Sequence, residues 1–499
     1  MATNGIPGSP AKKMRPDRST APAALGPPTF DLDTWASNYG GALLPLRLAH
    51  VAVYCPSLAR QSLTLAIAET RKGKNVELYV RLCELAKQLG MEDLGASDGE
   101  YVARQQESNR RETVRLEGEL RGYKNNLIRE SIRMGQEDIA THLMSTGGPL
   151  PDPNNPQSVH SAGFNAAYQA FGKMRDYCTT PTHIASMTLH LVYCALIQAV
   201  SAQQLGLAAA THFNSALANA GRLRTVGVKE EEQVKLTPIA SVATGIAQLS
   251  MTYYHDAAHS FLNTPFDYHT LGTVHSTDFN RSVASANDVA IYGGLTALAT
   301  YDRTELIDKV LGGNFRPFLE LEPHMRKAIS LYTTAKYQAC LDTLRRYYSD
   351  WRLDVFLGGL ASSLGETHVD RLFARIRQKS IVAYLSSYSE VSLASLADTF
   401  PPLTNSPTAM EDEVLHLIHL GHLHARLDVV NGLLIAPRSE PRAAAHAEAR
   451  KMAVEIERSL RLRLMRVNVS LAGLELPRSK AGAGTWGQAE AVGDAGFGD

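Results

Sequence analysis

The sequence predicts a mainly α-helical protein: a tetratricopeptide-like helical-repeat solenoid, capped by a winged helix and followed by one C-terminal helix. Three observations predict this architecture. Apolar residues recur at three- and four-residue spacings through most of the chain, which is the period of an amphipathic helix. Near the C-terminus this pattern gives way to two short apolar runs separated by Asn431 and Gly432. A last helical segment then carries apolar residues on more than one side.

The composition is typical of a soluble globular protein with large cores. The chain has 499 residues, of which 50 are basic, 50 are acidic and 44% are hydrophobic. The length predicts about two to four packed units, or one extended repeat array with a cap. Because the formal net charge is zero, the chain lacks the basic surplus of proteins that coat nucleic acid or anionic lipid. Its longest apolar stretch, residues 187–207, is interrupted by polar side chains, so we expect no membrane span.

Both ends of the chain differ in composition from the rest. Residues 1–29 are rich in Pro, Ala, Gly and Ser, and residues 472–499 are rich in Gly and Ala, so two disordered tails are expected. The first tail lacks the apolar stretch of a secretory signal, which favours the nucleus and cytoplasm. The five cysteines are scattered without a close pair, so we expect reduced thiols and no zinc knuckle.

A helical-repeat arm is predicted over residues 30–220. It begins with a helix, turn and helix over residues 43–65, broken at Pro56. The more polar segment 99–144 has an apolar stripe among Arg and Glu residues, which predicts one long amphipathic helix. Further helices continue to Tyr348 without a strict repeat period, so their pairs would be divergent. Such arrays usually present surfaces to other proteins.

Three helices and a hairpin predict a winged helix over residues 361–438. The helices are expected over residues 369–388, 393–400 and 410–424. The apolar runs 425–430 and 433–435 flank Asn-Gly, the strongest two-residue hairpin signal. The third helix begins with three acidic residues and contains no Lys or Arg, whereas a DNA-reading helix needs basic residues for phosphates and base edges. We therefore expect no direct nucleic-acid binding.

The final helix is expected over residues 439–471. One side of it carries five apolar residues, and three more add apolar area elsewhere, so the apolar surface is too broad for an ordinary surface helix. The five are Ile456, Leu460, Leu464, Val467 and Leu471, and the three are Leu462, Met465 and Val469. Either this helix folds back on its own winged helix or it packs among helices of other chains.

Several long stretches resemble the PCI-domain family, whose module is shared by subunits of the proteasome lid, the COP-nine (COP9) signalosome and translation initiation factor three. They are residues 79–82, 123–133, 175–179, 286–295, 297–306 and 318–323. The match runs from about Phe30 to Pro437 and is greatest to the subunit 1 family of the signalosome. It is weak over residues 219–236, and the polar insert 263–281 looks like an extra loop. The homologous regulatory subunit of the proteasome lid is the alternative within the same class.

The resemblance implies a PCI domain over residues 221–438, helical to about residue 360, and a C-terminal helix that joins a bundle of such helices from all subunits. It implies a non-catalytic scaffold in a complex that removes a ubiquitin-like modifier from cullins and so regulates cullin-RING ubiquitin ligases. The implied partners are other PCI subunits, the metalloprotease subunit and, through the complex, cullin-RING ligases; no cofactor is implied.

The expected assembly interface has two parts. The first is an exposed strand edge of the winged helix, open to strand addition by a neighbouring subunit. The second is the apolar side of the C-terminal helix. Their residues are Val429, Val430, Leu433, Leu434, Ile435, Ile456, Leu460, Leu464, Val467 and Leu471.

An enzyme is the alternative of another class. His255 and His259 lie one helical turn apart, the spacing that zinc hydrolases use with a Glu base between the two ligands. Asp256 replaces that Glu and no third ligand is evident, so two ordinary helix histidines are the favoured interpretation. The histidines of segment 416–424 lack the downstream Ser and Asp spacing of the signalosome metalloprotease. We therefore predict no catalytic, cofactor-binding or metal site.

Overall fold

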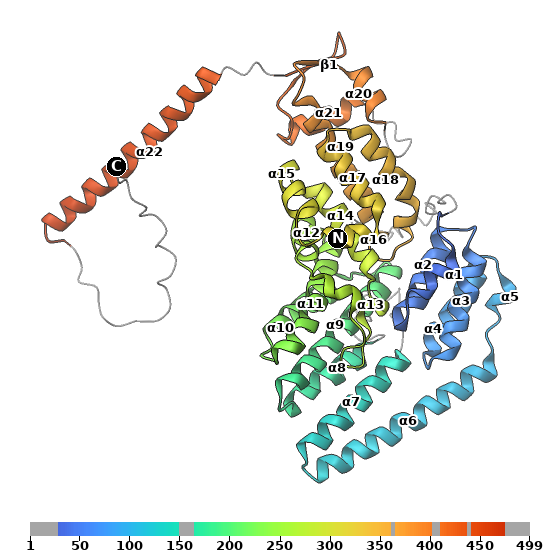
Figure 1. The fold of residues 1–499 in the computed structure, drawn as a ribbon. Helices are drawn as coiled ribbons and strands as arrows, with labels where there is room; N and C mark the ends of the chain where they lie inside the picture. Colours follow the sequence, from blue (N-terminus) through green and yellow to red (C-terminus); the bar gives the residue numbers. More distant parts are fainter. Residues whose placement is uncertain (1–27, 149–163, 361–364, 402–409, 437–440, 475–499) are drawn as a thin grey trace, which may run out of the picture. The chain divides into compact units, whose positions relative to one another are not determined.

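The computed structural model describes residues 28–148, 164–360, 365–401, 410–436 and 441–474 (Figure 1). The chain divides into two compact units, Met1–Leu434 and Ile435–Asp499. The predicted fold class, a helical solenoid with a winged helix, is confirmed in these residues. Nearly all of the two segments predicted as disordered tails lies outside the described residues.

The first unit begins with helices that pack on their neighbours in sequence, α2 on α3 and α3 on α4. They are α1 (Leu32–Ser37), α2 (Leu44–Tyr54), α3 (Ala59–Lys72), α4 (Val76–Gln88) and α5 (Glu92–Gly95). Two of them start at side-chain caps, because Asp31 and Asn75 each accept a hydrogen bond from a backbone N–H at 3.0 Å. The turn that contains Pro56 separates α2 from α3, which confirms the predicted helix, turn and helix.

Residues 99–144, predicted as one long helix, form a hairpin of two helices, so that prediction is wrong. The two are α6 (Gly99–Asn125) and α7 (Arg129–Thr146). Between them Leu127 has a φ of +56°, which is left-handed backbone that cannot continue a helix. The apolar stripe folds on itself, since Leu116 and Leu120 of α6 pack with Ile132 of α7.

The central helices form the solenoid, in which α8 packs on α9, α9 on α10, α10 on α11, α11 on α12 and α12 on α14. They are α8 (Asn165–Met174), α9 (Pro181–Gln204), α10 (Ala210–Thr225), α11 (Glu230–Ser250), α12 (Tyr254–Leu262), α13 (Phe279–Ser282) and α14 (Ala286–Thr300). Among the described residues, α9 alone is long and apolar enough to cross a membrane by length and composition. Its apolar window is 89% buried inside the unit, as in a core helix.

The insert 263–281, expected as an extra polar loop, packs into this solenoid. Tyr268 and Phe279 are fully buried. The Tyr268 hydroxyl donates a hydrogen bond to the carbonyl oxygen of Ala284 at 2.5 Å. The insert is therefore held by its own core side chains.

A buried polar network ties α2 to the segment that follows α18. The later helices of the unit are α15 (Arg303–Glu305), α16 (Arg316–Leu321), α17 (Pro323–Thr333) and α18 (Tyr337–Arg352), with a π-helical turn at Leu306–Leu311. Arg47 of α2 is completely buried, and its guanidinium donates to Asp354 Oδ1 at 2.6 Å and to the carbonyl oxygen of Val283 at 2.5 Å. Asp354 Oδ2 also accepts a hydrogen bond from the Tyr292 hydroxyl at 2.8 Å. Three regions far apart in sequence, at Arg47, at residues 283–292 and at Asp354, therefore meet at one buried ion pair.

The winged helix ends the first unit. Its elements are α19 (His368–Leu385), β1 (Glu390–Ser392), α20 (Leu393–Thr399), α21 (Met410–His419), β2 (Arg426–Asp428) and β3 (Leu433–Ile435). The strands form one sheet in the order β1-β3-β2. The three predicted helices and the hairpin are confirmed, although α21 ends at His419 rather than at residue 424. Strand β1 is an addition that the sequence pattern does not predict.

The second unit contains one long helix, α22 (Pro441–Leu471). The final helix, expected over residues 439–471, is described from Pro441 to Leu471. An ion pair between Arg461 and Glu457, at 2.6 Å, lies one turn apart along its surface.

Candidate assembly surfaces

The buried side chain of Arg377 links two helices of the winged helix. Arg377 of α19 pairs with Glu413 of α21, and its guanidinium also donates to the carbonyl oxygen of Phe400 at 2.7 Å. Arg377 is only 9% exposed, so this pair joins two helices inside the domain. One of the three acidic residues that open α21 therefore has a structural partner.

The hairpin turn between β2 and β3 projects two valines into solvent. Asp428 Oδ1 accepts hydrogen bonds from the backbone N–H groups of Val430 and Asn431, at 3.1 and 3.3 Å. The side-chain amide of Asn431 donates to Asp428 Oδ2 at 2.8 Å. These hydrogen bonds, that of the Asn431 side chain foremost, lower the pKa of Asp428. The fixed turn leaves Val429 64% and Val430 94% exposed.

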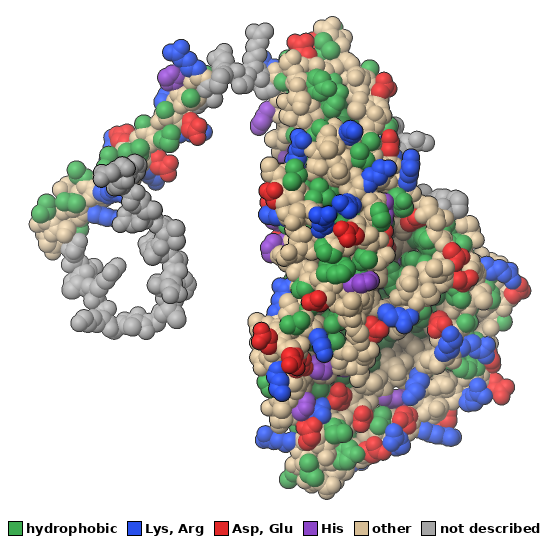
Figure 2. Space-filling model, in the orientation of Figure 1, with side chains coloured by type: hydrophobic (Ala, Val, Ile, Leu, Met, Phe, Trp, Pro, Cys, Tyr) green, Lys and Arg blue, Asp and Glu red, His purple; other side chains and the backbone are tan. Residues whose placement is uncertain are grey.

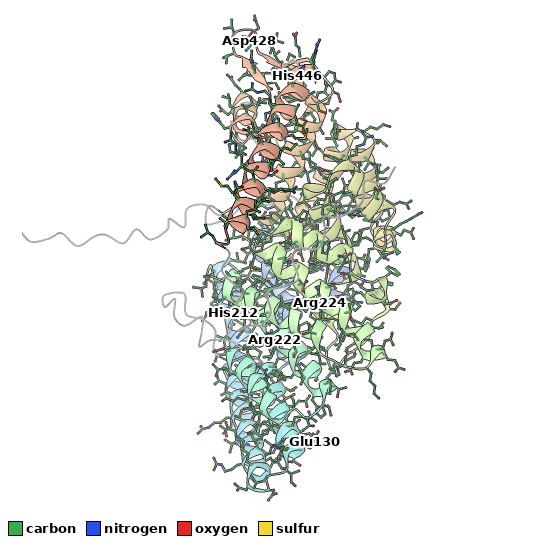
Figure 3. The ribbon with its side chains drawn as sticks, turned by 90° about the vertical axis from the view of Figure 1, so that its left-hand side faces the viewer. Glu130, His212, Arg222, Arg224, Asp428 and His446 are labelled. Carbon is green, nitrogen blue, oxygen red and sulfur yellow. The ribbon has the colours of Figure 1, made fainter. Side chains whose placement is uncertain are left out.

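The turn lies far from the α6–α7 hairpin. Asp428 marks one end of the first unit in Figure 3, and Glu130 of α7 lies toward the opposite end. The hairpin turn of the winged helix and the α6–α7 hairpin are therefore separate surfaces of the first unit.

The sheet does not offer the edge that the sequence predicts. Strand β3 lies between β1 and β2, so its backbone is paired on both sides and the expected free edge over residues 429–435 is wrong. Among the described strands, the outer edges of β1 and β2 have no strand beyond them. Leu434 is buried in the domain core, whereas Leu433 and Ile435 are half-buried. Any strand addition must therefore occur at β1 or β2.

Helix α22 carries two apolar stripes. Successive residues turn by about 100° around a helix, so the five predicted residues from Ile456 to Leu471 share one side. Leu462, Met465 and Val469 form a second stripe about 180° away. Within this unit none of these side chains is covered, and Leu460 and Met465 are 56% and 64% exposed. A helix with apolar stripes on opposite sides needs contacts on both sides to bury them.

The surface of the first unit carries mixed charge on the face drawn in Figure 2. Lys and Arg side chains are interspersed with Asp and Glu over this face. Such a surface lacks the extended basic stripe that neutralises nucleic-acid phosphates.

The paired histidines of α12 point into solvent. His255 is 68% exposed at its side chain and lies 3.6 Å from Asp256 of the same helix. His259 shares a hydrogen bond with the Asn263 side chain. No group of three His, Cys, Asp or Glu side chains that could hold a metal ion occurs in the described ranges, and this includes the exposed histidines of residues 416–424. The zinc hydrolase alternative therefore gains no support from these residues.

Comparison with known families defines the class of protein. A model of the PCI domain matches residues 344–438, which contain the winged helix. A model described as 26S proteasome subunit RPN7 matches residues 160–309, and the described part of this range, residues 164–309, belongs to the solenoid and the helical turns that follow it. Together with the solenoid and winged helix, these matches define a PCI-domain protein.

Curated relatives narrow the class to one family. COP9 signalosome complex subunit 1 of Emericella nidulans is 37% identical over 459 residues, covering 90% of this chain and 84% of the relative. The protein of the same name from Neurospora crassa is 32% identical, and the match covers 88% of this chain and 90% of the relative. The one from Arabidopsis thaliana is 31% identical, and the match covers 94% of each chain. The chain therefore belongs to the COP9 signalosome subunit 1 family, which confirms the resemblance predicted from sequence. The proteasome-lid match covers less than a third of the chain.

Proposed function

We propose that this chain is a non-catalytic scaffold subunit of a COP9 signalosome, the complex that removes the ubiquitin-like modifier from cullins and so regulates cullin-RING ubiquitin ligases. The observation that carries the proposal is α22, whose two uncovered apolar stripes fit a place inside a bundle of helices from several subunits. Membership of the COP9 signalosome subunit 1 family supports that complex as the one in which such a bundle would form.

In this proposal the chain contributes contacts, and a metalloprotease partner subunit contributes the hydrolysis. The other PCI subunits would meet the winged helix at the outer edge of β1 or β2, by strand addition. Val429 and Val430, exposed at the hairpin turn, would add apolar contact beside that edge. Cullin-RING ligases would be reached through the complex, in both the nucleus and the cytoplasm.

Mass spectrometry of proteins that co-purify with the tagged chain from its native cells, at moderate salt, tests the proposal. We expect the other signalosome subunits, including the metalloprotease, together with cullins. Recovery of proteasome lid subunits instead would identify the chain as a subunit of the proteasome lid. Recovery of the chain alone would contradict the proposal.

A double substitution tests the part assigned to α22. Leu460→Glu with Leu464→Glu places two charges in the first apolar stripe, and we expect the other subunits to be lost from the purified material. The matched control, Ser459→Glu with Ser470→Glu, adds the same charge between the two stripes and should retain the subunits. Equal retention by both variants would show that α22 does not hold the chain in the complex.

A further inference from the structure

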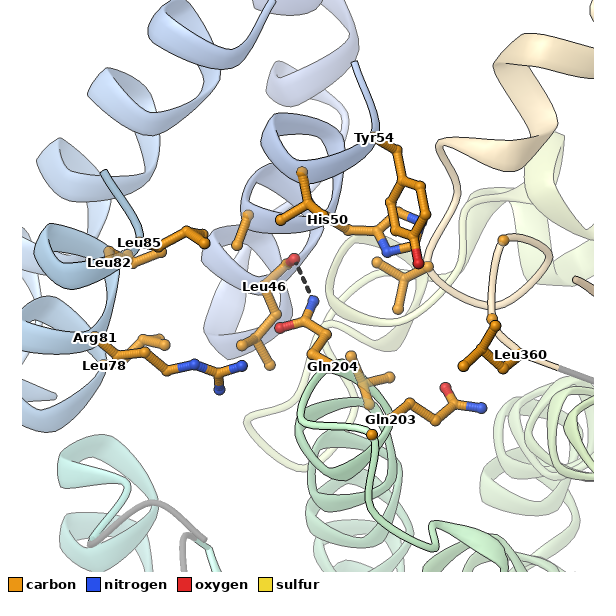
Figure 4. A pocket seen from close by; sticks show the side chains of 17 residues that line it. Leu46, His50, Tyr54, Leu78, Arg81, Leu82, Leu85, Gln203, Gln204 and Leu360 are labelled. Atoms are coloured by element: carbon orange, nitrogen blue, oxygen red, sulfur yellow. Dashed lines mark hydrogen bonds between the residues drawn. The ribbon is translucent and has the colours of Figure 1, made fainter. Parts of the chain in front are cut away.

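A cavity of about 290 Å³ lies inside the first unit. Its walls come from α2, α4, the C-terminal end of α9 and residues 355–360 (Figure 4). Most of the lining is aliphatic, and it includes Leu46, Leu82, Leu85 and Val200. An apolar cavity of about 150 Å³ in another protein holds benzene, so this larger cavity has room for a hydrocarbon body of about ten carbons.

One cationic side chain enters the cavity without a counter-ion. Figure 4 shows Arg81 reaching from α4 into the cavity. Its Nη1 atom is buried and has no hydrogen-bond partner among the described residues, and none of the described lining residues carries a carboxylate. Burial lowers the pKa of Arg81. A guanidinium nevertheless stays charged at neutral pH, so the cavity holds an uncompensated positive charge.

The other polar side chains that line the cavity are uncharged. The Gln204 side chain donates to a backbone carbonyl oxygen of α2 at 2.7 Å. His50 Nε2 lies 3.1 Å from a backbone carbonyl oxygen, and burial lowers the pKa of this histidine, so it is neutral at neutral pH. Gln203 lies on the far side of the cavity from Arg81, with Gln204 between them (Figure 4). Arg81 is therefore the only charged side chain among the described lining residues.

A single cation within aliphatic walls specifies the chemistry of a ligand. A carboxylate matches the planar fork of a guanidinium, and a charge-assisted pair of this kind is stronger than a neutral hydrogen bond. One cation balances a monoanion, whereas a phosphate monoester carries a charge of about −1.5 to −2 at neutral pH. Aliphatic walls require a hydrocarbon body. A carboxylic acid with one aliphatic chain combines these features.

We propose that this cavity binds an aliphatic monocarboxylic acid of about eight to ten carbons, with its carboxylate on Arg81 and its chain against the leucine and valine side chains of α2, α4 and α9. The proposal is independent of the assembly role, since no residue of the cavity belongs to the winged helix or to α22.

Isothermal titration calorimetry of the full chain tests the charge of the ligand. Octanoate should bind, and octanamide, which has the same chain without the charge, should bind at least about tenfold more weakly. Equal binding of octanoate and octanamide, or no binding of octanoate at millimolar concentration, would overturn the proposal.

The length of the acid tests whether its chain lies in the cavity. Each additional buried CH₂ group should tighten binding about fourfold, so octanoate should bind about 15-fold more tightly than hexanoate. This gain should end between decanoate and tetradecanoate, because the cavity is then full. An affinity that rises by the same factor up to tetradecanoate would place the acids on an exposed apolar surface, and this result would exclude the cavity as their site.

Substitutions on α4 test the role of Arg81. Arg81→Met should weaken binding of octanoate about tenfold and leave that of octanamide unchanged. Lys87→Met removes the same charge from an exposed position on the same helix and should leave the binding of both compounds unchanged. Binding of octanoate by Arg81→Met with the affinity of the natural chain would refute the assignment.

A second variant and a stability measurement separate a binding role of Arg81 from a role in folding. Arg81→Lys keeps a positive charge at this position, so it should retain the preference for octanoate over octanamide. The unfolding midpoint of the unliganded Arg81→Met chain should not fall, because Nη1 has no hydrogen-bond partner to lose among the described residues. A lower midpoint, together with loss of the acid preference in Arg81→Lys, would assign Arg81 to the fold instead.

Discussion

Two buried histidines remain uncharged in the folded protein. Burial is the main cause that lowers the pKa of His190 to about 4, and burial, aided by Arg371, lowers that of His368 to about 4. His190 stacks on Phe171 with ring centroids 4.7 Å apart, and His368 shares a 3.0 Å hydrogen bond with the Tyr254 hydroxyl. Both imidazoles therefore serve as core side chains that hold helices together.

These pKa shifts predict a loss of stability in acid. In the unfolded chain a histidine gains its proton near pH 6.5, whereas in the folded chain each of these two gains it only near pH 4. Because the unfolded state binds more protons between these values, the free energy of unfolding falls as the pH decreases from about 6.5 to 4. Each histidine should contribute about 2–3 kcal/mol to this loss at pH 4.5.

The His190→Phe variant isolates one of these contributions. Phenylalanine keeps a ring against Phe171 and cannot titrate. Urea unfolding at pH 7 and pH 4.5 should therefore show a smaller acid-induced loss in the variant than in the natural chain, by about 2–3 kcal/mol. The same acid-induced loss in both chains would mean that His190 is protonated in the folded state as readily as in the unfolded state.

At the scale of single elements, the turn between α6 and α7 stores backbone strain. Leu127 adopts a positive φ and is 81% exposed, so its side chain gains almost no burial in return. Asparagine tolerates left-handed backbone better than leucine does. Leu127→Asn should therefore stabilise the hairpin by about 1 kcal/mol, and slower amide hydrogen exchange in α6 and α7 would show it. Faster exchange would mean that the leucine side chain makes a stabilising contact.

The same turn shows what the sequence pattern could and could not predict. The apolar stripe of residues 99–144 indicates helix correctly, but its period is the same for one long helix and for two helices that fold on each other. Only the asparagines at positions 125 and 126 hint at a break, since neither Gly nor Pro occurs there. Strand β1, Glu-Val-Ser, is too short and polar to be distinguished from a loop by its sequence. It is a strand because its backbone pairs with that of β3.

Some residues of the candidate surfaces can also be found from the sequence, whereas others cannot. The apolar residues of α22 can be found from sequence because a helix places them by period alone. The free sheet edges could not be assigned, because strand order depends on contacts between residues 390–392 and 433–435. Arg47 and Asp354 are 307 positions apart, and Arg81 gives no local signal of the cavity that it enters. Such groups become visible only when the chain is folded.

At the scale of the whole molecule, the Arg47–Asp354 pair should decide whether the first helices stay docked. Removing one partner of a buried ion pair leaves the other charge without compensation, which typically costs about 3–5 kcal/mol. We expect Arg47→Met to lower the free energy of unfolding by this amount and to speed amide hydrogen exchange in α2. Arg60→Met breaks a pair with Asp93 whose side chains are 70% and 83% exposed, so it should change stability by no more than about 0.5 kcal/mol. A similar small effect of both substitutions would contradict this role for Arg47.

Stability and assembly should be separable, because the buried ion pair and α22 belong to different compact units. The Leu460→Glu with Leu464→Glu chain should unfold at the same urea concentration as the natural chain, since both side chains are already exposed within their unit. It should nevertheless lose its partner subunits. Arg47→Met should show the reverse. Its unfolding midpoint should be lower, but the chains that are folded should still bind the partner subunits. If the α22 variant also lowered the unfolding midpoint, α22 would be packing on its own chain. Its apolar stripes would then stabilise the fold of this chain and not only its contacts with other subunits.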